Sequence, residues 1–434
     1  MPVPPCDKRS TRFCPLTFHA HLSTVALTGY ETITVFKSDY NAIQTFWFHA
    51  YIPSLNKEPG TLCDSRVFNL GDSFTTNYSL FPYSVASVVS ANAGDSGISY
   101  KGTTLENCDL SSLYLTGDIS TYTIDYTAII TCRSDEFEFT ARTDFSQSSL
   151  AGKYNPVVSV DRSQKNRQSG AFNKTRDARG ILLDAVTGLS SNDIATRIFS
   201  IAQAAANVSA YPVILSVQVD FPFCPASLGR AATCATSVPQ FTLSRSFISF
   251  SNVTFQQYDP SQPPAPNNQP VITDATSNAV SNVIQSVAAL VRLDLGNPSP
   301  NNFLLNTSAI PATLFATFPA LPGVPDSPNQ SQEYAVLTGA ATDPAYNITG
   351  LLPLTVAGPA ALDVVYLCRF QHAKAPAQAF VAVLVATLSM FGSGWAVFLG
   401  LATAVVKRRR ANANTCSQHA REPTGEKQAF LVPG

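Results

Sequence analysis

The sequence predicts a mainly antiparallel β, sandwich-like ectodomain with helical insertions, α+β overall, followed by one C-terminal transmembrane α-helix. Alternation of apolar and polar residues along several runs before residue 143 predicts strands, and an apolar stripe near residue 285 predicts a core helix. An uncharged run over residues 375–406 predicts the membrane helix. The chain has 434 residues, a length that suggests two or three domains. Hydrophobic residues make up 45% of it, enough to bury a sizeable core.

The composition limits the function. Charged residues make up only 13% of the chain, whereas 44 Ser and 39 Thr give it a hydroxyl-rich surface that is unusual for a cytosolic enzyme. The formal net charge is −1, so nothing in it favours a nucleic-acid partner. Residues 1–375 carry 22 Lys+Arg and 27 Asp+Glu, but residues 407–434 carry 6 and 2, so positive charge is concentrated behind the uncharged run.

The β-rich part of the ectodomain is expected over residues 61–258, after an N-terminal segment, residues 1–60, that is hard to assign. In the run STYTIDYTAIITC, the side chains of Tyr122, Ile124 and Tyr126 share one face of a half-buried strand. The strands are expected over residues 32–36, 44–51, 79–90, 110–115, 120–132, 136–143, 213–221 and 241–255.

A helical insert is expected within this part, at about residues 175–207. Ile194 and Ile198 lie at helical spacing, and Ser190 with Asp193 forms a capping box that would start a helix at the next residue. The insert therefore interrupts the run of strands without adding a domain of its own.

The proline-rich run DPSQPPAPNNQP, residues 259–270, predicts a linker and the main domain boundary. A second ectodomain part made of a helix and strands is expected over residues 271–374. Its helix covers residues 280–291 and is stopped by Gly296, and its last strand covers residues 361–370.

The uncharged run is long enough to cross a bilayer, because about 20 helical residues span a hydrocarbon core of about 30 Å. Four basic residues follow it directly: Lys407, Arg408, Arg409 and Arg410. The positive-inside rule then places the basic tail, residues 407–434, in the cytosol and the large N-terminal part outside it. We expect the four basic side chains to contact anionic lipid headgroups.

Small residues recur at every fourth position of the predicted membrane helix, at Gly392, Ala396, Gly400 and Ala404. Such a stripe lets two helices approach closely, so homo-association through this helix is one interpretation. Gly and Ala are also common in membrane helices that do not associate, which is the alternative.

Eight of the nine cysteines precede the membrane run, an even number that fits disulfides in an oxidising compartment. Cys224–Cys234 is the first predicted pair because it closes a short loop, and Cys108–Cys132 is the second. The pairing of the other candidates stays open, including that of Cys63 and Cys368. No CxxC pair or Cys/His cluster indicates zinc, and we expect no metal or other cofactor.

Seven Asn-x-Ser/Thr sequons precede the membrane run, in agreement with the predicted orientation. The candidate glycosylation sites are Asn77, Asn173, Asn207, Asn252, Asn306, Asn329 and Asn347.

Two short motifs imitate hydrolases without the partners that catalysis needs. Residues 94–97, Gly-Asp-Ser-Gly, match the core of a trypsin-like nucleophile loop, but no upstream His has a catalytic context. Residues 71–74, Gly-Asp-Ser-Phe, resemble the nucleophile block of GDSL-type esterases, but no Asp-x-x-His follows. His19 and His21 could form part of a metal site, but no third ligand is evident. The sequence therefore predicts no catalytic residue.

Three segments, NLGDSFTTNYS, KTRDARGILL and DLGNPSPNNFLLNTS, together with the membrane helix and its basic cluster, resemble uncharacterised single-span transmembrane proteins of basidiomycete fungi. The resemblance covers about residues 60–410, implies a fungal membrane protein, and transfers no activity or site residue. Such relatives carry a hydrophobic segment near the N-terminus, whereas residues 1–27 lack a continuous apolar run. We therefore expect an incomplete N-terminus, with a second span left open.

The function expected from these features is that of a single-pass membrane glycoprotein at the plasma membrane or in the secretory pathway. A non-enzymatic binding or structural role, with a carbohydrate or protein ligand, is the leading hypothesis. An ectoenzyme acting on cell-wall glycan and a tail-anchored protein with a cytosolic domain are the alternatives. The expected partners are the lipid bilayer and a second copy of the chain.

Overall fold

The computed structural model describes most of the predicted ectodomain and the C-terminal helix. The described residues are 30–45, 60–90, 97–118, 123–133, 137–148, 182–183, 185–197, 213–228, 234, 241–250, 253–265, 268, 276–298, 302–320, 330–340 and 349–415. The chain divides into two compact units. One consists of Phe36–Asn41 and Asp64–Tyr366, and the other of Met1–Val35, Ala42–Cys63 and Leu367–Gly434.

The larger unit, which contains Asp64–Tyr366, is built on one eight-stranded antiparallel sheet in the order β11-β10-β9-β6-β7-β8-β4-β3. Its strands are β3 Ser73–Thr75, β4 Pro82–Ser90, β6 Cys108–Asp118, β7 Thr123–Arg133, β8 Phe137–Ser148, β9 Val213–Asp220, β10 Thr242–Phe250 and β11 Val253–Tyr258. This topology confirms the predicted class, which is mainly antiparallel β with helices.

The alternation seen in the sequence decides which face of the sheet is buried. Along β7, Ile124, Tyr126 and Ala128 are buried, whereas Asp125 between them is exposed. Strands β6 and β9 repeat the pattern in register, since Leu115 of β6 lies opposite both Tyr126 and a buried valine of β9. The apolar residues of neighbouring strands therefore form one continuous core face.

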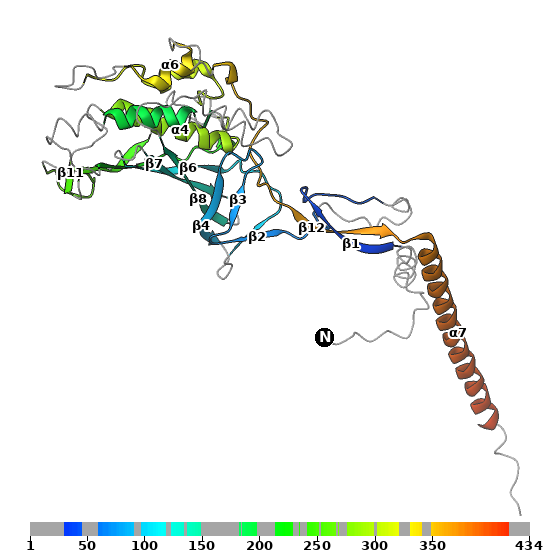
Figure 1. Ribbon diagram of the computed structural model, residues 1–434. Coiled ribbons are helices and arrows are strands. Elements are labelled where there is room, and N and C mark those ends of the chain that lie inside the picture. Colours follow the sequence, from blue (N-terminus) through cyan, green and yellow to red (C-terminus); the bar gives the residue numbers. More distant parts are fainter. Residues whose placement is uncertain are drawn as a thin grey trace, which may run out of the picture. The chain divides into compact units, whose positions relative to one another are not determined.

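Helices, rather than a second large sheet, form the layer over this core face, which differs from a sandwich arrangement. Figure 1 shows α4, Ser277–Asp294, between the sheet and α6, Gln332–Thr338. Most residues of α4 are buried, including polar ones such as Asn282, because both sides of the helix are covered. The shorter helices are η2 Ala226–Leu228, η4 Thr307–Ala309, α5 Ile310–Thr313 and η6 Thr349–Leu351.

The helical insert lies in the same layer. Residues 182–183 and 185–197 are helical, so Ser190 and Asp193 lie inside the helix and are not its N-terminal cap. The expected capping box is therefore wrong, and both side chains contact α6 instead.

At the end of α4 the expected stop is present. Gly296 has a φ of +67°, and a Cβ there would lie 2.2 Å from the carbonyl oxygen of Gly358, so only glycine fits.

Residues on both sides of the proline-rich run belong to the same compact unit, which contains Asp64–Tyr366. The side chain of Asn268 donates hydrogen bonds to the carbonyl oxygens of Asp259, Gln262 and Pro263, and it accepts one from the backbone nitrogen of Asp259. The described residues of the run, 259–265 and 268, are therefore folded back on one another at the surface, and the helix that follows shares the core of the sheet.

A small sheet of two strands, β2 Arg66–Asn69 and β5 Gly97–Tyr100, belongs to the same unit. Phe68 of β2 is buried and its ring lies 5.7 Å from that of Phe74 in β3. At this end of the large sheet, two β layers do face each other, as the sandwich hypothesis expected.

The other unit contains most of a two-stranded sheet formed by β1, Tyr30–Lys37, and β12, Tyr366–Ala373. The side chain of Gln44 joins this sheet by accepting a hydrogen bond from the backbone nitrogen of Gln371 and donating one to its carbonyl oxygen. Helix α7, Pro376–Thr415, follows β12 almost directly and extends past the expected end at residue 406.

Helix α7 is long and apolar enough to cross a membrane over Pro376–Arg410, with a mean hydropathy of 1.8. None of the residues in its most apolar window is buried by the rest of the protein, and large side chains such as Phe391 and Leu401 are highly exposed. A long helix with this apolar surface is typical of a membrane span.

Candidate functional site

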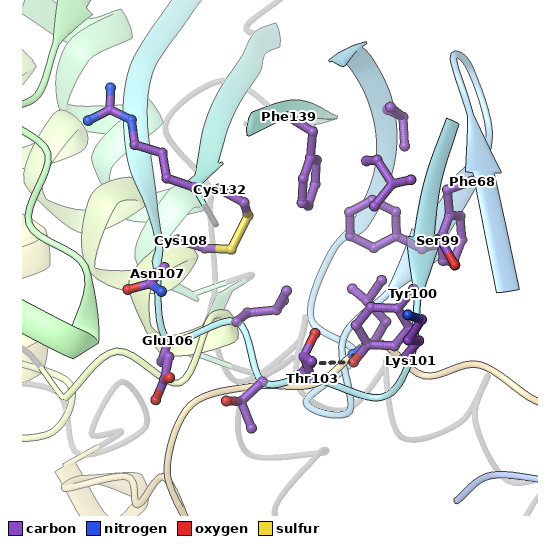
Figure 2. Close-up of a pocket in the computed structure, with 17 residues that line it drawn as sticks. Phe68, Ser99, Tyr100, Lys101, Thr103, Glu106, Asn107, Cys108, Cys132 and Phe139 are labelled. Atoms are coloured by element: carbon purple, nitrogen blue, oxygen red, sulfur yellow. Dashed lines mark hydrogen bonds between the residues drawn. A yellow bond between two sulfur atoms is a disulfide. The ribbon is translucent and has the colours of Figure 1, made fainter. Parts of the chain in front are cut away.

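A cavity of about 570 Å³ lies between the β2–β5 sheet and the adjoining strands of the large sheet (Figure 2). Its volume is in the range of small-molecule binding sites, which is about 300–1,000 Å³. The residues that line it are Phe68, Phe74, Val85, Ile98, Ser99, Tyr100, Lys101, Thr103, Thr104, Leu105, Glu106, Asn107, Cys108, Cys132, Arg133, Phe139 and Leu362.

The interior of the cavity is aromatic and aliphatic. Phe68, Phe74, Tyr100 and Phe139 are each more than nine-tenths buried. The ring of Phe74 lies 6.5 Å from that of Phe139, and the ring of Phe68 lies 6.4 Å from that of Tyr100. These side chains come from both sheets, so the cavity exists only because the two sheets face each other.

Among the buried aromatic side chains of this lining, Tyr100 carries a polar group. Its hydroxyl already forms hydrogen bonds within the protein, both as donor and as acceptor. It donates a hydrogen bond of 2.6 Å to the carbonyl oxygen of Thr103 and accepts one of 3.0 Å from the backbone nitrogen of Leu362. Burial raises the pKa of this phenol above its usual value, so the hydroxyl stays neutral.

The disulfide Cys108–Cys132 forms part of the cavity wall (Figure 2). This is the second pair expected from the sequence. The two cysteines lie directly opposite each other in the register of β6 and β7, with their Cα atoms 4.0 Å apart. A direct cross-strand pair of this kind brings the Cβ atoms close enough for a disulfide.

Charged side chains lie only at the rim of the cavity. Lys101, Glu106 and Arg133 are exposed. Figure 2 shows Lys101 beside Tyr100 on one side of the cavity and Glu106 on the other. Arg133 is already engaged, because its guanidinium lies 3.5 Å from the carboxylate of Glu138 and 4.3 Å from the centre of a phenylalanine ring. Lys101 makes no ion pair with any residue that the structure describes.

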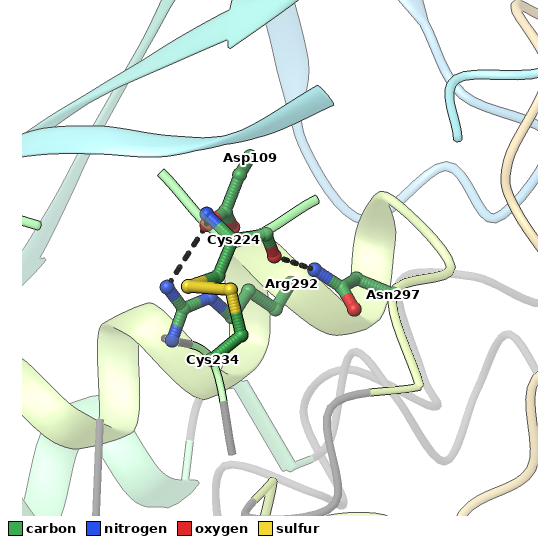
Figure 3. The surroundings of a disulfide bond; sticks show 5 residues. All are labelled: Asp109, Cys224, Cys234, Arg292 and Asn297. Carbon is green, nitrogen blue, oxygen red and sulfur yellow. Dashed lines mark hydrogen bonds and ion pairs between the residues drawn. A yellow bond between two sulfur atoms is a disulfide. The ribbon is translucent and has the colours of Figure 1, made fainter. Parts of the chain in front are cut away.

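The first predicted disulfide, Cys224–Cys234, is also present, and the protein holds it through the backbone of Cys224 (Figure 3). The backbone nitrogen of Cys224 donates to Asp109 Oδ2 at 2.8 Å, and Asn297 Nδ2 donates to its carbonyl oxygen at 3.0 Å. Asp109 in turn forms a buried bidentate ion pair with Arg292 of α4, at 2.9 and 3.1 Å. Sheet, helix and disulfide loop therefore meet at one carboxylate.

A second group of buried carboxyls, which we call the carboxyl cluster, consists of Asp193 and Glu333 at the contact of three helices. Glu333 of α6 accepts hydrogen bonds from the hydroxyls of Ser190 and Ser286. Asp193 accepts a hydrogen bond of 3.0 Å from the backbone nitrogen of Gln332. Burial raises the pKa of Glu333 to about 8 and that of Asp193 to about 7.

The third disulfide among the described residues joins Cys63 and Cys368, whose pairing the sequence left open. The two residues are 305 positions apart and meet as an isolated antiparallel bridge. They immediately flank the chain that forms the large unit, so this disulfide ties together its entry and exit.

Two of the predicted glycosylation sites lie among the described residues, Asn77 and Asn306, and both are exposed. Asn306 Oδ1 accepts hydrogen bonds from the backbone nitrogen and the hydroxyl of Ser308, the third residue of its sequon. The other five sites, Asn173, Asn207, Asn252, Asn329 and Asn347, lie outside the described residues.

The catalytic and metal motifs weighed from the sequence form no site in the described part of the chain. Asp72 accepts a hydrogen bond from the backbone nitrogen of Asn69 and so shapes the turn before β3. His19, His21 and the motif at residues 94–97 lie outside the described residues, apart from Gly97, which begins β5. In the described ranges no three His, Cys, Asp or Glu side chains come together as a metal site.

Comparisons with family models, with curated proteins and with solved structures find no match to this chain. The cavity and the carboxyl cluster are therefore characterised by the geometry of their own residues, without a related protein for comparison. Neither was found from the sequence, because their residues come from seven strands and three helices and form no local motif. Alternation along β2 and β8 could have marked Phe68 and Phe139 as buried, but not as neighbours of one cavity.

Proposed function

We propose that this chain is a single-pass membrane glycoprotein whose large unit lies outside the cytosol and serves as a non-enzymatic binding or structural domain. The basic tail, residues 407–434, lies in the cytosol, and the protein resides at the plasma membrane or in the secretory pathway.

The observation that carries this proposal is α7, which presents apolar side chains on all sides of a run that is followed directly by Lys407, Arg408, Arg409 and Arg410. All four basic residues are exposed at the C-terminal end of the helix. A basic cluster at one end of a span favours the cytosolic side for that end.

Two further features support an exterior position for the large unit. Cysteines remain disulfide-bonded in oxidising compartments and are reduced in the cytosol, and this chain has three disulfides among its described residues. Asn77 and Asn306 are exposed on the folded surface, where attached glycans have room.

A binding role is favoured over glycan hydrolysis by the lining of the cavity. Hydrolysis of a glycosidic bond requires two carboxyl groups about 5–10 Å apart. Of the residues that line the cavity, one, Glu106, carries a carboxylate.

The proposal is tested by expressing the full chain in a eukaryotic host and treating it with peptide N-glycosidase. We expect faster migration on gel electrophoresis after treatment, and no such change when all seven sequon asparagines are replaced by glutamine. A chain that migrates identically before and after treatment would place the large unit in the cytosol, as in the tail-anchored alternative.

A matched pair of variants sharpens the test at Asn306. Ser308→Ala destroys this sequon, whereas Thr307→Ala changes its middle residue and preserves it. We expect one glycan to be lost in the first variant and none in the second. Loss in both variants would mean that the local fold, and not the sequon, decides the result.

Association of two copies through α7 remains a separate proposal. Gly392 and Gly400 have open space where a side chain would lie, and with Ala396 and Ala404 they form the predicted stripe. We expect Gly392→Leu with Gly400→Leu to abolish dimers in a membrane association assay. Gly394→Leu, on the other side of the helix and equally open, should leave them intact. Equal effects of both changes would exclude the stripe as the interface.

A further inference from the structure

The cavity between the two sheets has an apolar buried part, whereas all seven polar or charged residues that line it are exposed: Ser99, Lys101, Thr103, Thr104, Glu106, Asn107 and Arg133. Its deepest residues are Phe68, Phe74, Ile98 and Phe139, all buried. The hydroxyl of Tyr100 is used by the protein on both its donor and acceptor sides. The hydroxyl of Ser99 donates to that of Ser65, at the exposed margin.

The buried part of this lining disfavours sugars and nucleotides, because their hydroxyl and amide groups would be desolvated there without a partner. The body of the ligand must be apolar. A ring-lined apolar interior of this volume is instead suited to a hydrocarbon chain, which needs only contact and exclusion of water.

The rim identifies the polar end of the ligand. Lys101 follows Tyr100 directly at the end of β5 and is exposed, with no ion pair to a described residue. Arg133 already faces Glu138, and Glu106 stands on the opposite side of the cavity (Figure 2). An anionic headgroup therefore finds an available cation at Lys101 and repulsion at Glu106.

We infer that the cavity binds a long-chain fatty acid, with the acyl chain against Phe68, Phe74 and Phe139 and the carboxylate at Lys101. This assignment gives the ligand class for the proposed binding role. It rests on that role, but it requires nothing of the orientation of α7 in the membrane.

The test uses the full chain in phosphatidylcholine nanodiscs with hexadecanoic acid that carries a diazirine near the end of its chain. After irradiation, we expect labelled peptides from β2, β5 and β8 in mass spectrometry. The same probe partitions into the bilayer and labels α7, which provides an internal reference in every sample. An excess of unlabelled hexadecanoic acid should remove the cavity label and leave most of the α7 label.

Two valines of β4 give a matched pair of variants. Val85 lines the cavity and is 3% exposed, whereas Val89 on the same strand is 66% exposed. Val85→Trp fills the cavity and should abolish the cavity label, while Val89→Trp should retain it. Circular dichroism and the disulfide pattern show whether each variant is folded.

An exposed substitution provides a second measurement that does not depend on core packing. Lys101→Glu should weaken binding of the fatty acid about fivefold, since one exposed charge pair is lost, and leave binding of the corresponding alcohol unchanged. Lys37→Glu, a charge reversal on the exposed surface of β1, should change neither.

Label confined to α7 in the unaltered chain would overturn the inference and leave the membrane span intact. Equal loss of acid and alcohol binding in Lys101→Glu would overturn the assignment of the headgroup. Conversely, cavity label on a chain that carries no glycan would refute the proposed orientation and preserve the binding site.

Discussion

Asp109 and Glu333 are both fully buried carboxyl groups in the large unit, but the protein surrounds them in different ways. Asp109 faces the guanidinium of Arg292 in a bidentate ion pair and also holds the backbone of Cys224. Glu333 accepts hydrogen bonds from two serine hydroxyls, and burial raises its pKa to about 8.

The comparison shows that a buried acid can be stabilised by an opposite charge or by staying protonated. The first arrangement depends on one partner and fails if that partner is removed. The second depends on proton concentration, because the protonated form is favoured in the folded state. We therefore expect mutation to reveal the ion pair and pH to reveal the carboxyl cluster.

The largest effect is expected from Arg292→Leu, which leaves Asp109 buried without its ion-pair partner. We expect a loss of about 3–5 kcal/mol in the free energy of unfolding. The measurement is urea denaturation of the full chain in detergent micelles, followed by circular dichroism.

Arg245→Leu is the control, because Arg245 forms an ion pair with Asp259 while remaining 61% exposed. Loss of this pair should cost only about 0–1 kcal/mol. Similar losses in the two variants would remove the distinction between a buried and an exposed pair.

The next effect is the pH dependence of stability. In the unfolded chain these carboxyls have pKa values of about 4, so between pH 4 and their folded pKa values of about 7 and 8 the folded state binds more protons. Stability is then greatest near pH 4–5 and falls as pH rises through 7 and 8. We expect a loss on the order of 3 kcal/mol between pH 5 and pH 8.

The same urea titrations, repeated at several pH values, measure this slope. A free energy of unfolding that rises between pH 5 and pH 8 would contradict the raised pKa values of Asp193 and Glu333.

Removing the disulfide beside the ion pair should have a smaller effect. Replacing Cys224 and Cys234 with alanine should cost about 2 kcal/mol, since the closed loop is short. Because Asp109 holds both Cys224 and Arg292, the loss should not add to that of Arg292→Leu in a double-mutant cycle. Strict additivity would show that the two features are independent.

The smallest effect isolates one acid of the carboxyl cluster. Glu333→Gln keeps the shape of the side chain but cannot ionise, so the variant should lose part of the pH slope and be about 1 kcal/mol more stable than the unaltered chain at pH 8. Glu138→Gln, at an exposed carboxyl, should leave the slope unchanged. An unaltered slope in Glu333→Gln would assign the pH dependence to other groups.

The sequence predicted the features that depend on residues close together in the chain, and it missed those that depend on residues far apart. The sequence placed β7 and α4 because their apolar residues recur at the spacing of a strand and of a helix, and it placed α7 because a long uncharged run is visible in the sequence itself. The pairs Cys108–Cys132 and Cys224–Cys234 also close short distances along the chain. The capping role of Ser190 was wrong because its hydroxyl serves Glu333, 143 residues away.

The sequence by itself determined the β-rich class, the helix over α4 and the apolar helix near the C-terminus, because periodicity and charge are local properties. Only the tertiary structure decided that helices cover the large sheet, that Cys63 meets Cys368, and that Lys101 stands at the mouth of an aromatic cavity. These features depend on strand order and on contacts between distant residues, which no local pattern of side chains specifies.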